Sequence, residues 1–196
     1  MPAPAAVSPA PVPTTDSNSN DVFIGPLDCG DLREVGKNAV ITISTAKSGN
    51  GVEQLRDGNL DTFWQSDGSA PHLINIQFLR KTAVSKVCLY MDYTLDESYT
   101  SKKISIRSGT SQHDLVDVSA VELNQPVGWC QIHLKGDTTG DGENESLRTH
   151  LLQIRILSMH QNGKDAHVRQ LCVYGPRQEE QPAFRTVEMS QYTHVR

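Results

Sequence analysis

The amino-acid sequence predicts an all-β protein, a jelly-roll β-sandwich with a polar tail at each end. Apolar and polar side chains alternate in many short runs, which is the period of half-buried strands. Gly, Pro, Asn and Asp separate the runs, as turn residues do. Only residues 52–58 have a helical pattern, with Gly58 as its stop. About eight or nine short strands with almost no helix suit a jelly roll.

The alternation assigns the faces of the strands in order along the chain. In residues 72–78, Ile74, Ile76 and Phe78 share one face and the polar residues share the other. Residues 85–92 and 102–109 repeat this pattern. Further strands are predicted at residues 128–134, 150–157 and 168–175.

The chain divides into one domain and two tails. Residues 1–28 are rich in Pro, Ala, Ser, Thr, Asn and Asp and have few large apolar groups, so we expect a disordered tail. Residues 177–196 are similarly polar and form a second predicted tail. The predicted β-sandwich domain covers residues 29–176, which is enough to bury a core without disulfides or metals.

Composition disfavours several classes of function. The net charge of −5 argues against nucleic acid or an anionic membrane as a partner. The four cysteines form no Cys-x-x-Cys pair, so a cysteine zinc site is not expected. The N-terminus lacks the pattern of a secretory signal, and no apolar run approaches the length of a membrane span. We therefore expect an intracellular protein with reduced thiols and no cofactor.

Two loops could hold a cation on their composition alone. In the acidic stretch 136–146, the calcium-loop spacing fails because Arg148 takes the place of the final Glu, so we read it as a mobile insertion. The turn 57–62 carries Asp57, Gly58, Asn59, Asp61 and Thr62 before Trp64. A braced turn with a core tryptophan is the favoured interpretation, and a calcium ion held by the turn is the alternative.

The loop "MHQNGKDAHVRQ", residues 159–170, carries the densest set of polar groups. His160, Asp165 and His167 could supply three metal ligands, but a zinc site also needs a second shell. Asp165 could orient His167, and His167 could act as a general base, but no activated nucleophile accompanies them. Recognition of an extended peptide is favoured over metal binding and catalysis, because such loops at the end of a rigid sandwich commonly bind ligands.

Three motifs in order, "FWQSDGSAPHLINIQF", "DESYTSKKISIRSG" and "MHQNGKDAHVRQLCVYGP", resemble the Doc-domain family of anaphase-promoting complex subunits. The resemblance covers about residues 32–176 and lies within the galactose-binding-like sandwich superfamily. It implies a non-catalytic subunit of a ubiquitin ligase that co-recognises destruction-box degrons beside a WD-repeat coactivator. It also implies processive ubiquitination in the cell cycle, in the nucleus and cytoplasm.

The resemblance assigns degron contacts by position. The candidate residues are Ser66, Asp67, Gln161, Asn162, Gly163, Asp165, His167 and Arg169. Asn162, Asp165 and His167 are the favoured contacts, and Gly163 makes the turn. A structural alternative pairs Arg169 with Asp165 to brace the loop. Ala166 and Met159 depart from the family pattern, which expects a hydroxyl residue and Asn there.

The C-terminal dipeptide Val195-Arg196 gains a function only through the resemblance. Doc subunits typically end in Ile-Arg, which docks into tetratricopeptide scaffold subunits. Val in place of Ile removes one methylene, about 0.8 kcal/mol when fully buried, so docking should weaken without being lost. The rival prediction is a carbohydrate-binding module on the same sandwich, which would need aromatic platforms that this sequence, 6% aromatic, offers sparingly.

Overall fold

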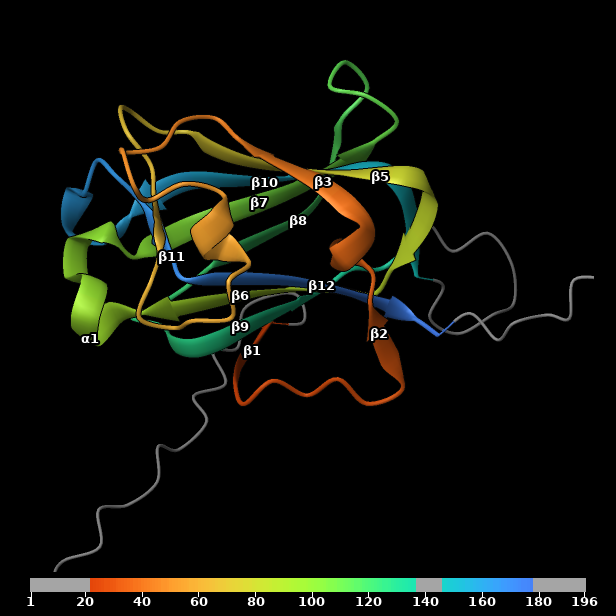
Figure 1. Cartoon of the computed structure of the whole chain (residues 1–196), viewed down its shortest axis with the longest axis horizontal. Helices are drawn as coiled ribbons and strands as arrows, with labels where there is room; N and C mark the ends of the chain where they lie inside the picture. Colours follow the sequence, from red (N-terminus) through yellow and green to blue (C-terminus); the bar gives the residue numbers. More distant parts are fainter. Residues whose placement is uncertain (1–21, 137–145, 178–196) are drawn as a thin grey trace, which may run out of the picture.

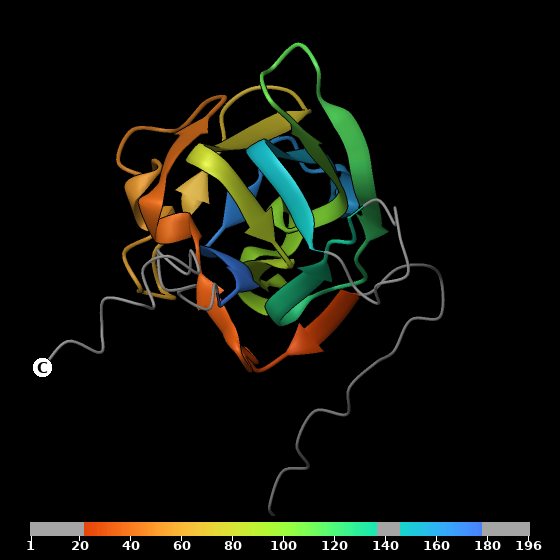
Figure 2. The ribbon, with the colours of Figure 1, turned by 90° about the vertical axis from the view of Figure 1, so that its right-hand side faces the viewer.

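The computed structural model describes residues 22–136 and 146–177, in which two antiparallel sheets pack face to face (Figure 1). The strands are β1 (Val22–Gly25), β2 (Leu32–Glu34), β3 (Ala39–Ile43), β4 (Trp64–Gln65), β5 (His72–Val84), β6 (Lys86–Asp92), β7 (Ser101–Gly109), β8 (Val116–Glu122), β9 (Val127–His133), β10 (Leu147–Met159), β11 (His167–Val168) and β12 (Gln170–Pro176). One sheet has the order β1-β9-β6-β12-β2 and the other β3-β5-β10-β7-β8. The two layers enclose the core (Figure 2), and the predicted all-β sandwich class is confirmed.

Helical structure is limited to short turns between the strands. These are α1 (Tyr93–Asp96) and the 3₁₀ turns η1 (Gly36–Asn38), η2 (Glu53–Leu55), η3 (Glu97–Tyr99) and η4 (His160–Asn162). The helical pattern of residues 52–58 forms only η2, a single turn. No helix in the described part of the chain is both long and apolar enough to cross a membrane.

The core follows the predicted alternation. Ile74 and Ile76 of β5 and Ile104 and Ile106 of β7 are buried between the sheets, and so is Trp64, whose Nε1 donates to the Thr45 carbonyl at 2.9 Å. Each such aliphatic side chain contributes about 1.5–3 kcal/mol by leaving water. The tryptophan therefore anchors the start of β4, as the sequence predicted.

Strand β6 is buried on both faces, which alternation did not predict. Residues 26–31 cross the outer side of its sheet: Lys86 Nζ donates to the carbonyl of Asp28 and, at 2.9 Å, to Oε1 of Gln131. Gln131 in turn donates to the Pro26 carbonyl at 2.9 Å. β1 and residues 26–28 of this connection lie N-terminal to the domain start predicted at residue 29. That boundary was too late because β1 pairs along β9.

Three predictions from the sequence fall outside the described residues. They concern most of the two tails, the acidic insertion over residues 137–145, and the C-terminal dipeptide Val195-Arg196. These stay predictions.

Candidate recognition site

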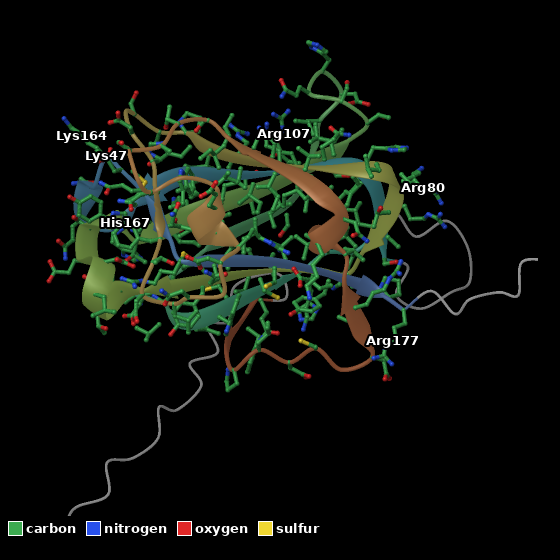
Figure 3. All side chains as sticks on the ribbon, in the orientation of Figure 1. Lys47, Arg80, Arg107, Lys164, His167 and Arg177 are labelled. Carbon is green, nitrogen blue, oxygen red and sulfur yellow. The ribbon has the colours of Figure 1, made fainter. Side chains whose placement is uncertain are left out.

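The predicted site residues come together at one end of the sandwich, where α1, η3, η4 and β11 meet (Figures 1 and 3). β11 pairs with β4, with His167 opposite Gln65. Beyond this pair, Ser66 N donates to the Ala166 carbonyl at 3.0 Å, and Ala166 N donates to Ser66 Oγ at 2.7 Å. The Ser-Asp-Gly turn and the 159–170 loop therefore form one continuous surface.

Ser66 and Ala166 act inside this surface rather than on it, because both are fully buried. The Ser66 hydroxyl is used by the Ala166 backbone. Position 166 faces the interior, so Ala166 removes no polar group from the exposed surface. Met159 is likewise buried in the core cluster. The two departures from the family pattern thus fall on interior positions.

Turn η4 carries two exposed polar residues of the loop, Gln161 and Asn162. Gln161 and Asn162 both lie in the left-handed region, at φ 51° and 56°. This conformation costs non-glycine residues about 1–2 kcal/mol, and Asn least among them. Gln161 Nε2 donates to the Tyr93 hydroxyl at 3.0 Å. Asn162 is exposed and its side chain makes no hydrogen bond with another described residue, so it is available to a ligand.

Position 163 has room only for glycine. A Cβ built on it would collide with the backbone carbonyl of Ser98 in η3. Its N–H closes the turn by donating to the His160 carbonyl at 2.9 Å. The role predicted for Gly163, in the turn, agrees with this close approach of η4 to η3.

Asp165 pairs with Lys47, a residue that the sequence did not single out. Lys47 Nζ lies 2.8 Å from Asp165 Oδ2, and Gln65 Nε2 donates to the same oxygen at 3.4 Å. The hydrogen bond from Lys47 lowers the pKa of Asp165 below its usual value and raises that of Lys47. The carboxylate is therefore ionised at the edge of the surface, held by one lysine.

Behind this edge, Asp96 joins His167 and Arg169 in a buried cluster. Arg169 donates to Asp96 from Nε at 2.9 Å and from Nη2 at 2.8 Å, and its Nη1 donates to the Leu60 carbonyl at 2.7 Å. His167 Nδ1 lies 3.0 Å from Asp96 Oδ1. Burial raises the pKa of Asp96, but hydrogen bonds from His167 and Arg169 outweigh it and lower the pKa from its ordinary value.

The His167 ring is stacked between two aromatic rings. Phe63 and Tyr99 lie at centroid distances of 4.1 and 4.2 Å from it. Its Nε2 is buried and has no hydrogen-bond partner among the described residues. His167 and Arg169 are both buried, with 8% and 5% of their surface exposed. They position the loop, and the alternative pairing of Arg169 with Asp165 does not occur.

A shallow pocket adjoins the exposed residues. It has a volume of about 480 Å³ and is lined by Asp67 to Ala70 on one side and by Met159 and Gly163 to Asp165 on the other. Asp67 is exposed at its rim. Polar groups around a shallow depression suit an extended chain better than a small enclosed ligand.

The side-chain amide of Gln170 braces the turn of residues 57–62, for which a bound calcium ion was the alternative interpretation. Gln170 Nε2 contacts Asp57 Oδ1 at 2.5 Å and the carbonyls of Gln54 and Asn59 at 3.0 Å each. Thr62 Oγ1 donates to Asp57 Oδ2 at 2.5 Å. The oxygens that could have held calcium therefore converge on Gln170. Across residues 22–136 and 146–177, no group of three or more His, Cys, Asp or Glu side chains is arranged to bind a metal.

The class of protein follows from the fold. The sandwich is similar to the family 32 carbohydrate-binding module of Clostridium perfringens NanJ in complex with galactose, with a TM-score of 0.59, 11% identity, and coverage of 73% of this chain and 98% of that one. An F5/8 type C domain from Bacteroides fragilis gives a TM-score of 0.59 and 11% identity, covering 75% of this chain and 98% of its own. At this identity the likeness shows the β-sandwich fold alone and nothing of its ligand.

Sequence relatives give the particular family. The family model described as "Anaphase-promoting complex, subunit 10 (APC10)" matches residues 9–195. The human anaphase-promoting complex subunit 10 is 46% identical over 171 residues, 85% of this chain and 90% of the human protein. The Drosophila melanogaster subunit is 51% identical over 147 residues, 75% of this chain and 73% of its own. The chain belongs to the family of anaphase-promoting complex subunit 10 and is a non-catalytic subunit of that complex.

The sequence missed the residues that position the loop from a distance. Asp96, Lys47, Phe63 and Tyr99 come from separate segments, and none was a candidate. A signal was present for three of them: Phe63 opens the motif "FWQSDGSAPHLINIQF", and Asp96 and Tyr99 lie in "DESYTSKKISIRSG", two motifs that carried the family resemblance. A motif-based search for the partner of Arg169 would have begun there.

Proposed function

We propose that this surface co-recognises destruction-box degrons together with a WD-repeat coactivator, and so promotes processive ubiquitination of substrates in the nucleus and cytoplasm. The observation that carries the proposal is the contrast in burial within one loop. Asn162 is exposed and the half-buried carboxylate of Asp165 lies at the edge of the surface beside Lys47, while Asp96, His167 and Arg169 lock the backbone beneath them. Rigid presentation of a few polar groups lowers the entropic cost of holding a peptide.

Roles within the candidate set follow from exposure. Asp67, Gln161, Asn162 and Asp165 contact the degron, and Gly163 makes the turn that presents them. Ser66, His167 and Arg169 act as positioning residues. The mixture of amide and carboxylate groups suits the backbone N–H and C=O groups of an extended chain together with a basic side chain.

Shared degron binding acts on the lifetime of the bound substrate. A second contact beside the coactivator forms at high effective concentration, so a modest affinity for this surface extends residence. More ubiquitins are then added before release. In the same scheme, Val195-Arg196 docks into a tetratricopeptide scaffold subunit.

The test uses the reconstituted ligase with N162A and D165A single and double variants. We expect fewer ubiquitins per degron-bearing substrate in one binding event, with assembly and thermal unfolding unchanged. Matched controls are Gln112→Ala and Asp31→Ala, which remove an exposed amide and an exposed carboxylate elsewhere. Equal processivity of the N162A/D165A double variant and the unmodified protein would reject the degron role.

A glycan array probed with the same full chain distinguishes the degron role from the alternative function, carbohydrate binding. The stacked faces of Phe63 and Tyr99 are taken by His167, which leaves few open aromatic faces for sugars. We therefore expect no specific glycan. Reproducible binding that N162A or D165A abolishes would favour the rival instead.

A further inference from the structure

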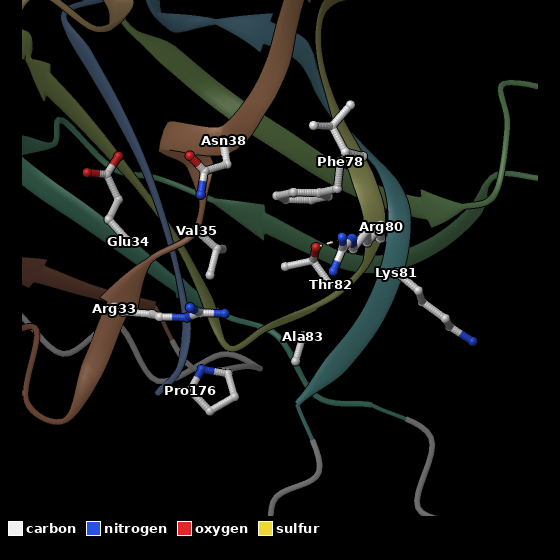
Figure 4. A pocket seen from close by; sticks show the side chains of 11 residues that line it. Arg33, Glu34, Val35, Asn38, Phe78, Arg80, Lys81, Thr82, Ala83 and Pro176 are labelled. Atoms are coloured by element: carbon white, nitrogen blue, oxygen red, sulfur yellow. Dashed lines mark hydrogen bonds between the residues drawn. The ribbon is translucent and has the colours of Figure 1, made fainter. Parts of the chain in front are cut away.

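A second pocket lies at the other end of the sandwich and has a volume of about 430 Å³ (Figure 4). Phe78 and Val35, both buried, contribute an apolar floor. Arg33 and Arg80 extend toward it from opposite sides in the close-up, and Lys81 points away at the rim. Figure 3 places Arg80 and Arg177 at the end opposite Lys47, Lys164 and His167. We call this feature the basic pocket, residues 33–35, 38, 78–83 and 176.

An irregularity in β5 presents the rim of the basic pocket. Gln77 pairs with Leu151 and Thr82 with Thr149, so residues 78–81 face a single residue of β10. Such a bulge frees side chains from strict alternation. Leu79, Arg80 and Lys81 are consecutive and all exposed, and Leu79 is 82% exposed, the highest value among the exposed large apolar side chains of the described chain.

The charge of the basic pocket opposes that of the whole chain. The net charge is −5, yet the pocket is lined by Arg33, Arg80 and Lys81. Glu34, the acidic residue among the lining, is already paired with Arg56 at 2.6 Å and Lys37 at 3.5 Å. Neither Arg80 nor Lys81 forms an ion pair with another described residue. Local positive potential beside an exposed leucine attracts a ligand that is both acidic and apolar.

We propose that the basic pocket docks an acidic segment bearing a bulky apolar side chain from another subunit of the anaphase-promoting complex. The carboxylates face Arg80 and Lys81, and the apolar group covers Leu79 and reaches the floor at Phe78. The inference rests on assembly into the complex and not on degron contact.

The course of the chain supports a partner subunit on this side. Pro176, the last residue of β12, lines the basic pocket, so the proposed scaffold-docking tail leaves the sandwich here. A contact at the basic pocket and one by the tail therefore start from the same end. The recognition site lies at the opposite end of the sandwich (Figure 1). A partner docked at the basic pocket would therefore leave that site open to coactivator and degron.

The first test is the R80E/K81E variant of the full chain, titrated into the complex that lacks this subunit. We expect apparent affinity to fall by about tenfold or more, because reversed charges repel an acidic partner and leave its carboxylates unpaired. The loss should shrink as salt is raised. The matched control is K102E/K103E, two neighbouring surface lysines on β7 whose pairs with Glu122 are 3.5 Å long and exposed.

A photo-crosslinker in place of Leu79 identifies the occupant in the assembled complex. A crosslink to an acidic segment of another subunit, lost in R80E/K81E, supports the proposal. A crosslink to residues 178–196 of the same chain, a crosslink to a basic or neutral surface, or no crosslink overturns it. Unchanged incorporation of R80E/K81E also overturns it.

Folding and the degron role are controlled separately. If R80E/K81E unfolds at a lower temperature, the milder R80Q/K81Q variant replaces it, with the same expected direction. Processivity per assembled complex reports the degron site, and incorporation reports the basic pocket. Failure of one proposal therefore leaves a distinct signature from failure of the other.

Discussion

Arg169 on the strand-connecting loop and Asp96 at the end of α1 form a two-bonded ion pair, at 2.9 and 2.8 Å, with both residues 5% exposed. The pair joins segments 73 residues apart. A buried pair of this kind is costly to break, since removing one partner leaves the other charge unsolvated. The recognition loop therefore depends on a residue outside it.

Asp96→Asn should lower the free energy of unfolding by about 3–5 kcal/mol, because Arg169 loses its counter-charge in the interior. Urea unfolding followed by tryptophan fluorescence measures this. Asp67→Asn, on the exposed rim, should stay within about 0.5 kcal/mol. A shift for Asp96→Asn no larger than that of the control would contradict the buried cluster.

Gly163→Ala should destabilise the protein by about 1–3 kcal/mol, because the added methyl group meets the Ser98 carbonyl. Degron-dependent processivity should fall with it as η4 shifts. Gly51→Ala is the matched control, since its new Cβ would lie 3.9 Å from Gln54 Oε1, an ordinary contact. Equal thermal unfolding of the two variants would show that η4 has more room than the structure gives it.

Gln170→Ala should cost about 1–3 kcal/mol by leaving the Asp57 carboxylate and two carbonyls without their shared donor. Hydrogen exchange should rise in residues 54–62 more than elsewhere. Gln112→Ala, an exposed amide, supplies the baseline. Unaltered exchange in the turn would mean that Gln170 does not brace it.

His160 should make stability fall in mild acid. Burial lowers its pKa below the ordinary 6.5, and its ring packs edge-on against Tyr93 at 5.1 Å. The unfolded state then binds more protons, so the stability is complete above pH 6.5 and is lost as pH falls through 6.5 toward the folded-state pKa. The difference in unfolding free energy between the unmodified protein and His160→Phe should decrease across that range. A difference independent of pH would contradict the neutral buried ring.

Val195→Ile should strengthen docking of the C-terminal tail by up to about fourfold, the equivalent of about 0.8 kcal/mol for one buried methylene. Deleting Val195-Arg196 should weaken incorporation into the complex. Both are measured by competition for the assembly lacking this subunit. Incorporation that neither change affects would show that the tail does not dock through its end.

The sequence by itself determined the fold class and marked one loop as a candidate site. Alternation depends on neighbours along the chain, so it correctly assigned the inward faces of β5 and β7. The concentration of polar groups in residues 159–170 was enough to mark that loop as a candidate site. The family resemblance came from local motifs in order, and comparison with known relatives confirmed it.

Only the tertiary structure decided which of those polar groups face outward. The loop gives the same polar character to Asn162 and Arg169, yet one is exposed and the other is enclosed by Asp96 and the Leu60 carbonyl. Similarly, Lys86 is buried because the Asp28 carbonyl and Gln131 Oε1 supply it with acceptors. Whether a polar side chain is buried depends on partners brought from distant segments, and periodicity along one strand carries no record of them.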